Sequence, residues 1–490
     1  MNAPTLPFDN SYVRLPARFY ARLDPTPVSE PALLRVNARL CAELGIDAHW
    51  LASADGVAVL AGNRVPAGAE PVATAYAGHQ FGQYNPQLGD GRAHLLGELV
   101  DAEGRRVDLQ LKGSGRTPWS RGGDGRSPLG PVLREYLVSE GMHALGVPTT
   151  RALAAVSTGE RVFREGVEAG AVLARVASSH IRVGTFQYFA ARGDREALEA
   201  LLAHVIERHY PAVAGDDRPA LALLGAVVAR QAGLIASWQQ LGFIHGVMNT
   251  DNMLLCGETV DYGPCAFMEV FDPRAVFSSI DHGGRYAYQN QPGIAHWNLV
   301  RLAEALLPLI DDDSDRAVGL ARETLDAFPQ QFEAAHGAGL ARKLGFAGLR
   351  PEDSELVEDL FSALAADEAD FTLAFRYLTE RDGPQADAMA TLFRPGEALA
   401  AWLPRWQTRL DDEGGDAAAR RERMRAVNPL FIARNHLVQG AIEAAEAGDL
   451  APFHRLAERV ADPFRWDPSD ADLARPAQPE ERVLRTFCGT

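Results

Sequence analysis

The segment from His245 to Gly263 restricts the fold of this chain more than any other, and it reads HGVMNTDNMLLCGETVDYG. Adjacent Asp251 and Asn252 precede the apolar run MLL, and a Gly-Glu pair separates that run from Asp261. This order predicts a tight hairpin with two acidic groups and an amide at its ends. Because magnesium prefers hard oxygen ligands, Asn252 and Asp261 are candidate metal ligands at a nucleotide site. Asp251 is then left for proton abstraction.

The order of these residues is that of the catalytic segment of protein kinases. In kinases an Asp acts as base, an Asn after it binds metal, and a second Asp after a hairpin also binds metal. The spacing differs here, because Asp251 and Asn252 are neighbours and Asp261-Tyr262-Gly263 replaces the Asp-Phe-Gly form. Either short motif alone is a common turn. Together, around one hairpin, they favour a site.

Composition sets the class of protein. A length of 490 residues allows roughly two to four domains and a large core. The net charge of -17 argues against a nucleic-acid groove or an anionic membrane surface. We expect no stretch to reach the roughly 18 apolar residues of a membrane span, and the N-terminus lacks the apolar block of a secretory signal. These features predict a cytoplasmic protein, or an organelle protein whose targeting segment has been removed, with a monomer as the default.

The first 190 residues predict a part rich in β-sheet. Alternating apolar and polar residues in VDLQLK indicate a half-buried strand that ends at Lys112. A Gly-rich stretch follows, and then a helix is predicted from Pro131 to Leu145, with Glu135 near its second turn. Kinases pair a strand Lys with a helix Glu to hold phosphates, and Lys112 with Glu135 fits that arrangement. The alternative for Lys112 is an ordinary surface lysine.

Glycine-rich segments and two arginines surround this strand. The stretch GHQFGQYNPQLGDGRAHLLGE carries Gly89, Gly91 and Arg92. Glycine lets backbone amides approach phosphate closely, although Gly-rich hairpins are frequent without a ligand and this is not the GxGxxG pattern of ordinary kinases. Arg175 lies in the strand-like run GAVLARVASS, and Arg182 lies in SHIRVGTF. Both suit phosphate oxygens, and both could equally be surface charges.

From about residue 195 the pattern becomes helical. The run from Pro219 to Leu241 predicts a buried helix that ends at Gly242. A second, amphipathic helix is predicted from Trp297 to Ile310. Residues 320–490 alternate helical segments with short Gly and Pro breaks.

Several long motifs in one order closely resemble the selenoprotein O family. They are YAGHQFGQYNPQLGDGRA, LKGSGRTPWSRGGDGRSPLGPVLREYL, HGVMNTDNM, SSIDHGGRYAYQNQP and NPLFIARNH. The resemblance implies an α+β, protein-kinase-like bilobal fold with a sheet-rich N-lobe, a helical C-lobe and a C-terminal helical extension. It places an N-terminal extension and the N-lobe in residues 1–190, the C-lobe with the catalytic and metal-binding loops in 191–320, and the C-terminal helical region in 321–490.

The resemblance also implies an activity. The family looks like a protein adenylyltransferase, which moves AMP from ATP to Ser, Thr or Tyr hydroxyls of other proteins with Mg²⁺ or Mn²⁺, and UMP transfer stays open. ATP lies flipped relative to a kinase, with the γ-phosphate buried, so attack on the α-phosphorus expels pyrophosphate. A divergent protein kinase and an inactive nucleotide-binding pseudokinase are the alternatives.

Site roles carry over residue by residue from the resemblance. The implied nucleotide contacts are Gly89, Gly91, Arg92, Asp124 and Gly125. The implied phosphate-binding and metal-binding residues are Lys112 steadied by Glu135, then Arg175 and Arg182 for the terminal phosphate, and Asn252 and Asp261 for the metal. Asp251 is the implied proton acceptor.

The C-terminal region carries two further expectations. Animal members of the family have selenocysteine third from the end, where this chain has Cys488. A pair between Cys488 and Cys265 would make activity redox-sensitive, and two unrelated thiols are the alternative. With Cys41 and Cys256 the chain has four cysteines, too few for a disulfide framework or a zinc knuckle. The motif NPLFIARNH is expected to brace the site.

Overall fold

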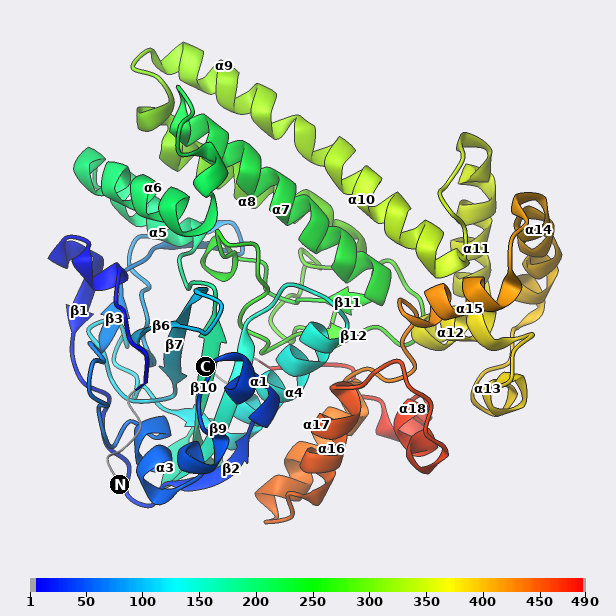
Figure 1. Cartoon of the computed structure of the whole chain (residues 1–490), viewed down its shortest axis with the longest axis horizontal. Helices are drawn as coiled ribbons and strands as arrows, with labels where there is room; N and C mark the ends of the chain where they lie inside the picture. Colours follow the sequence, from blue (N-terminus) through cyan, green and yellow to red (C-terminus); the bar gives the residue numbers. More distant parts are fainter. Residues whose placement is uncertain (1–5, 488–490) are drawn as a thin grey trace.

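An antiparallel sheet from the first third of the chain organises the molecule (Figure 1). The structure is a computed structural model and describes residues 6–487. The eight-stranded sheet has the order β1-β3-β6-β7-β10-β9-β2, with β8 paired to β10. Its strands are β1 Tyr20–Arg22, β2 Ala32–Val36, β3 Val72–Thr74, β6 Ala93–Val100, β7 Arg106–Lys112, β8 Ser127–Pro128, β9 Arg151–Phe163 and β10 Val167–Ala177.

The predicted strand that ends at Lys112 is confirmed as β7. Its neighbour β10 places Arg175 opposite Gln110 and Leu173 opposite Lys112. Side chains alternate between the two faces of a strand, and opposite residues of paired strands share a face. Lys112 and Arg175 therefore project from the same face of the sheet.

Each face of the sheet has its own helical cover. Leu109 and Leu111 of β7 pack in one cluster with three short helices, α1 Ala38–Glu43, α2 Ala48–Leu51 and α3 Ala54–Leu60. On the opposite face, Leu173 packs in one cluster with α4. The helix α4 spans Leu129–Ala144, so it begins two residues before the predicted Pro131. Lys112 and Arg175 thus face the helix that carries Glu135.

Helix α7 runs through the middle of the helical part. It spans Pro219–Leu241 as predicted, with Pro219 in its first turn and Gly242 in the left-handed conformation at φ 67°. It packs against α8 Gln291–Ile310 and α10 Ala327–Leu344. The predicted start of α8 at Trp297 was wrong, because Pro292 is accommodated in the first turn and the helix begins at Gln291.

The expectation that no stretch is apolar enough for a membrane span was also wrong. Within residues 6–487, α7 alone is long and apolar enough to cross a membrane by length and composition. However, 56% of that stretch is buried inside the structure, and core helices of globular proteins pass the same test.

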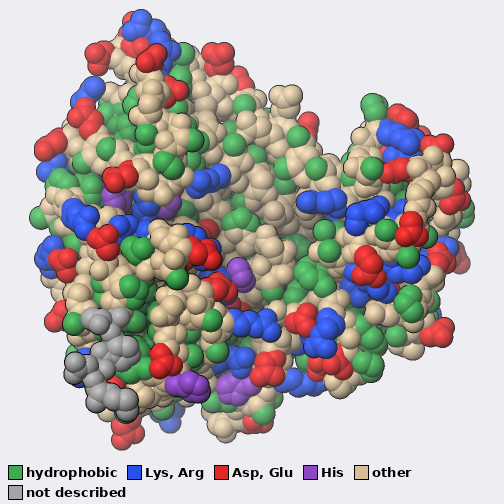
Figure 2. Space-filling view, viewed as in Figure 1, with side chains coloured by type: hydrophobic (Ala, Val, Ile, Leu, Met, Phe, Trp, Pro, Cys, Tyr) green, Lys and Arg blue, Asp and Glu red, His purple; other side chains and the backbone are tan. Residues whose placement is uncertain are grey.

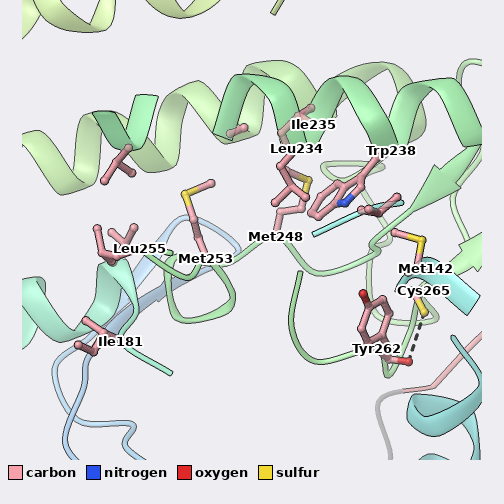
Figure 3. Close-up of a cluster of buried hydrophobic side chains, with 14 of the residues drawn as sticks. Met142, Ile181, Leu234, Ile235, Trp238, Met248, Met253, Leu255, Tyr262 and Cys265 are labelled. Atoms are coloured by element: carbon pink, nitrogen blue, oxygen red, sulfur yellow. Dashed lines mark hydrogen bonds between the residues drawn. The ribbon is translucent and has the colours of Figure 1, made fainter. Parts of the chain in front are cut away.

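A hydrophobic layer supports the segment from His245 to Gly263. Figure 3 shows Leu234 and Trp238 of α7 beside Met248, Met253 and Tyr262, which are all buried. Trp238 Nε1 also donates a hydrogen bond to Thr259 Oγ1 at 3.0 Å. The ends of the segment are brought together where β11 Phe243–Ile244 pairs with β12 Ala266–Phe267.

The predicted hairpin between Asn252 and Asp261 was wrong. The chain does reverse at Gly257, which has a φ of 81°. Its two arms pair elsewhere, however, because Leu254 bridges to Arg182 and Thr259 bridges to Thr149. Buried backbone groups need hydrogen-bond partners, and distant segments supply them here.

Most of the regular structure in the rest of the described chain is helical, and the fold is α+β as predicted. These helices are α5 Val183–Ala190, α6 Arg195–His209, α9 Ser314–Leu325, α11 Ser354–Ala366, α12 Phe371–Glu380, α13 Ala386–Leu392, α14 Glu397–Glu413, α15 Ala417–Arg425, α16 Asn435–Glu446, α17 Ala451–Val460 and α18 Ala471–Ala474. Helices α16 and α17 return to pack on α4. The largest hydrophobic core therefore contains residues from all three of the predicted parts of the chain. The boundaries between these parts, near residues 190 and 320, stay predictions.

Candidate functional site

A cleft of about 570 Å³ contains all of the site residues predicted from the sequence. Those that line it are Gly89, Gly91, Arg92, Lys112, Asp124, Gly125, Glu135, Arg175, Arg182, Asp251, Asn252 and Asp261. A larger cavity of about 880 Å³, bordered by α1, α4 and α6, contains none of them. Residues far apart in the chain have thus been gathered into one place.

Within this cleft, three basic side chains converge on the carboxylate of Asp261. Lys112 Nζ lies 2.6 Å from Asp261 Oδ1 and 2.6 Å from Glu135 Oε2. Arg175 Nη1 lies 2.7 Å from the same Asp261 oxygen and 2.8 Å from Glu135 Oε1. Arg182 Nη1 lies 3.0 Å from Asp261 Oδ2. The single predicted pair, between the strand lysine Lys112 and the helix glutamate Glu135, is therefore in contact.

Burial and charge together set the protonation of this group. Arg175 and Arg182 are each only 2% exposed, so neither is the surface charge that the sequence left open. Burial alone would raise the pKa of the Asp261 carboxyl, but Lys112, Arg175 and Arg182 hold it well below its usual range. With its carboxylates ionised and its cations desolvated, the group is suited to exchange partners with a more highly charged phosphate anion.

Asp251 differs from Asp261 in the direction in which its pKa is shifted. It is 7% exposed, and burial raises its pKa to about 6 against the opposing charge of Arg182. Gln80 Nε2 donates to Asp251 Oδ2 at 3.2 Å, while Oδ1 has no hydrogen-bond partner within residues 6–487. A buried carboxyl with a raised pKa is a candidate proton acceptor.

The metal ligands predicted from the sequence lie in the same cleft. Asn252 Nδ2 donates to the carbonyl of Val247 at 2.9 Å, which leaves its amide oxygen as the atom suited to a cation. In the described part of the chain, no three His, Cys, Asp or Glu side chains form a ready metal cage. An amide oxygen and the Asp261 carboxylate fit a hard divalent ion that takes its other ligands from phosphate and water.

Local packing explains the three glycines of the cleft. A Cβ at Gly89 would lie 2.3 Å from the Trp119 ring, and one at Gly91 would lie 2.8 Å from the Trp119 carbonyl oxygen. A Cβ at Gly125 would lie 2.1 Å from the Gly115 carbonyl oxygen. These glycines shape the wall of the cleft whether or not a nucleotide touches them.

The cleft also contains polar residues that no sequence pattern indicated, among them Arg164 and Gln80. Arg164 forms two hydrogen bonds to the Asp124 carboxylate, each 3.0 Å long, from the turn between β9 and β10. Gln80 belongs to β4 Gly78–Gln80, which pairs with β5 Gln83–Asn85. Gln80 lies in the motif GHQFG, but no local pattern indicates its role, because its partner Asp251 lies 171 positions away in the sequence.

The C-terminal region reaches the site through NPLFIARNH. Arg134, the neighbour of Glu135, donates to Asn435 Oδ1 at 2.8 Å and also to the carbonyl of Cys265. Cys265 is fully buried, and burial raises the pKa of its thiol to about 11. Cys488 lies outside the described residues, so a pairing with Cys265 stays a prediction.

The positive charge of the site is inside the cleft. Figure 2 shows acidic and basic side chains interspersed over one face of the molecule. A small, strongly charged ligand rather than a broad polyanion suits such a distribution.

Comparison with known proteins decides the family. The family model for protein adenylyltransferase SelO matches residues 3–461. The chain belongs to the SelO family. It is 58% identical over 487 residues to the protein nucleotidyltransferase YdiU of Rhodopseudomonas palustris strain BisB5, covering 99% of both chains. YdiU proteins of Bradyrhizobium sp. strain BTAi1 and Alkalilimnicola ehrlichii are 59% and 56% identical over 99% of each chain. This SelO-family chain is therefore a protein nucleotidyltransferase, as predicted, with a nucleotide and a protein as its substrates.

Proposed function

We propose that this SelO-family protein transfers AMP from ATP to Ser, Thr or Tyr hydroxyls of other proteins. The observation that carries the proposal is the buried group of ion pairs that Lys112, Arg175 and Arg182 form with Asp261. A terminal phosphate held by two buried arginines is clamped and shielded, which makes it a poor group to transfer. The α-phosphorus, nearer the mouth of the cleft, is then the centre open to attack.

The proposed fold is kinase-like and bilobal. An ion pair between a strand lysine and a helix glutamate supports it, as does a cleft between the sheet and the segment that carries Asp251. The lobes would follow the predicted parts, 1–190 and 191–320, with 321–490 as the helical extension.

The proposed reaction is an in-line displacement. The acceptor oxygen forms a bond to the α-phosphorus, and the bond to the bridging oxygen breaks, so pyrophosphate leaves with that electron pair. The hydroxyl proton passes to Asp251, whose raised pKa suits it to accept a proton. Lys112, Arg175 and Arg182 offset the charge that develops on pyrophosphate.

Asn252 and Asp261 would hold Mg²⁺ or Mn²⁺. Their amide and carboxylate oxygens are suitable ligands, and both residues line the cleft. The ion would supply positive charge beside the phosphates. Isothermal titration of ATP with and without each metal would show whether Asn252→Ala weakens the metal-dependent part of binding.

One labelling experiment tests the function. The protein is incubated with an acceptor protein and ATP labelled at either the α- or the γ-phosphate, beside the isosteric variant Asp251→Asn. We expect acceptor label only from the α-position, and a loss of about 10²–10⁴-fold in the variant. Label from the γ-position alone would identify a kinase instead. No label from either position would identify an inactive nucleotide-binding protein.

A cytoplasmic location and a monomeric state are also proposed, on composition alone. Light scattering of the purified chain and fractionation of its host cells would test them.

A further inference from the structure

The carboxylate of Asp251 is covered by a small hairpin from a distant part of the chain. Strand β4 lies 171 positions before Asp251 in the sequence, yet Gln80 Nε2 reaches Asp251 Oδ2 at 3.2 Å. Gly78 lies two residues before Gln80 in the same strand, and a Cβ added there would lie only 2.5 Å from Asp251 Oδ1. One strand therefore contacts both oxygens of the carboxylate.

The alternation of side chains along β4 explains this arrangement. Residues two apart in a strand project from the same face, so Gly78 and Gln80 both face Asp251. His79 lies between them and projects the other way, where its Nδ1 is 2.8 Å from Gln187 Nε2. The face toward Asp251 thus offers one small residue and one amide donor.

The strand itself is held firmly against the catalytic segment. The His79 amide donates to Thr250 Oγ1 at 2.7 Å, and the Phe81 amide donates to Asn249 Oδ1 at 3.0 Å. Thr250 Oγ1 in turn donates to Gln187 Oε1 at 2.6 Å. Because these bonds tie the strand to the two residues immediately before Asp251, the position of the strand affects the position of the carboxylate.

We propose that β4 clamps the side chain of Asp251, the proposed base. Gln80 is a positioning residue that holds Oδ2 by a hydrogen bond, and Gly78, which has no side chain, leaves room for Oδ1. The inference deepens the proposed function and rests on it, because it assumes that Asp251 accepts the acceptor proton. Gln80 does not itself touch the reacting atoms in this role. It fixes the rotamer of the side chain that does.

Two variants and one control test the clamp in the full-length protein, with α-labelled ATP and an acceptor protein. Gln80→Ala removes the donor to Oδ2, and we expect kcat to fall about tenfold, the rate equivalent of one charge-assisted hydrogen bond. Gly78→Ala pushes the carboxylate aside, and we expect a loss of about a hundredfold, as for a small displacement of a reacting group. In both variants KM for ATP stays within about twofold, because the phosphate-binding group is untouched.

Gln83→Ala is the matched control. Gln83 pairs with Gln80 across the same hairpin, but it is exposed and does not line the cleft. We expect wild-type kinetics and a wild-type melting temperature from it, and melting temperatures within a few degrees of wild type from the two test variants.

Three results would overturn the clamp. The first is an unchanged kcat in both Gln80→Ala and Gly78→Ala. The second is a rise in KM for ATP in place of the loss of kcat, which would make Gln80 a nucleotide contact. The third is an equal loss in Gln83→Ala, which would make the hairpin merely structural. Asp251→Asn, assayed alongside, distinguishes failure of the clamp from failure of the proposed function. If Asp251→Asn keeps wild-type activity, the proposed base is rejected together with the clamp. If Asp251→Asn loses activity while Gln80→Ala and Gly78→Ala keep theirs, the clamp alone is rejected.

Discussion

At the scale of single residues, the buried ionic group around Asp261 links stability to activity. Arg175 is 2% exposed and contacts both Glu135 and Asp261. Removing one partner of a buried ion pair leaves uncompensated charge at a cost of about 3–5 kcal/mol. Since Lys112 and Arg182 remain, we expect Arg175→Ala to lower the free energy of unfolding by about 3 kcal/mol. We expect AMP transfer to fall by about 10²–10³-fold, measured by initial rates below the melting temperature.

Arg161→Ala provides the comparison for this substitution. Arg161 is an exposed residue of β9, the strand next to β10, so its removal should change stability by less than about 0.5 kcal/mol. Wild-type transfer by a folded Arg175→Ala protein would show that this arginine does not bind the phosphates.

At the scale of elements, two helices end on glycines whose conformations only glycine adopts readily. Gly146, after α4, has a φ of 81°, and Gly242, after α7, has a φ of 67°. A Cβ at Gly146 would meet no described atom within 4 Å, whereas one at Gly242 would lie 2.9 Å from the Phe371 ring. We expect Gly146→Ala to cost about 1 kcal/mol and Gly242→Ala about 3 kcal/mol, since overpacking adds to the backbone strain.

Denaturant unfolding of the two variants measures this difference directly. Gly242 also leads into the catalytic segment through β11, so its variant should lose activity as well as stability. Equal costs at the two positions would mean that the Phe371 ring moves aside freely.

At the scale of the whole molecule, a buried ionic cluster joins the C-terminal helices to the rest. Arg434, fully buried before α16, lies 2.9 Å from Glu269 and 2.8 Å from Asp370. Burial opposes ionisation of Glu269, but the His436 ring, whose Nδ1 lies 3.5 Å from Oε1, and the Arg434 guanidinium lower its pKa to about 2. Because this value is below the ordinary 4.5, the contribution is complete above about pH 4.5 and is lost as pH falls toward 2. The lowering corresponds to about 3 kcal/mol.

Melting temperatures of wild type and Glu269→Gln should therefore differ most near neutral pH and converge on acidification. The exposed Glu480→Gln serves as control and should melt with wild type at every pH. A constant gap between wild type and Glu269→Gln would contradict the ionic role of Glu269.

The elements that could be predicted are those with local causes. The limits of α7 followed from an apolar run between a proline and a glycine, and β7 followed from strict alternation. The turn at Gly257 was also local, but the pairing of its arms was not. Leu254 and Thr259 found partners at Arg182 and Thr149, which no local pattern indicates.

The candidate site divides in the same way. The sequence by itself determined which residue types were present for phosphate, metal and proton chemistry, and long motifs were enough to determine the family. Only the tertiary structure decided that Arg175 and Arg182 are buried against Asp261, and that Gln80 reaches Asp251 from 171 positions away. The physical reason is that burial and long-range contact depend on how the sheet, α4 and α7 pack together. Patterns within a few residues carry the local conformation, but not that packing.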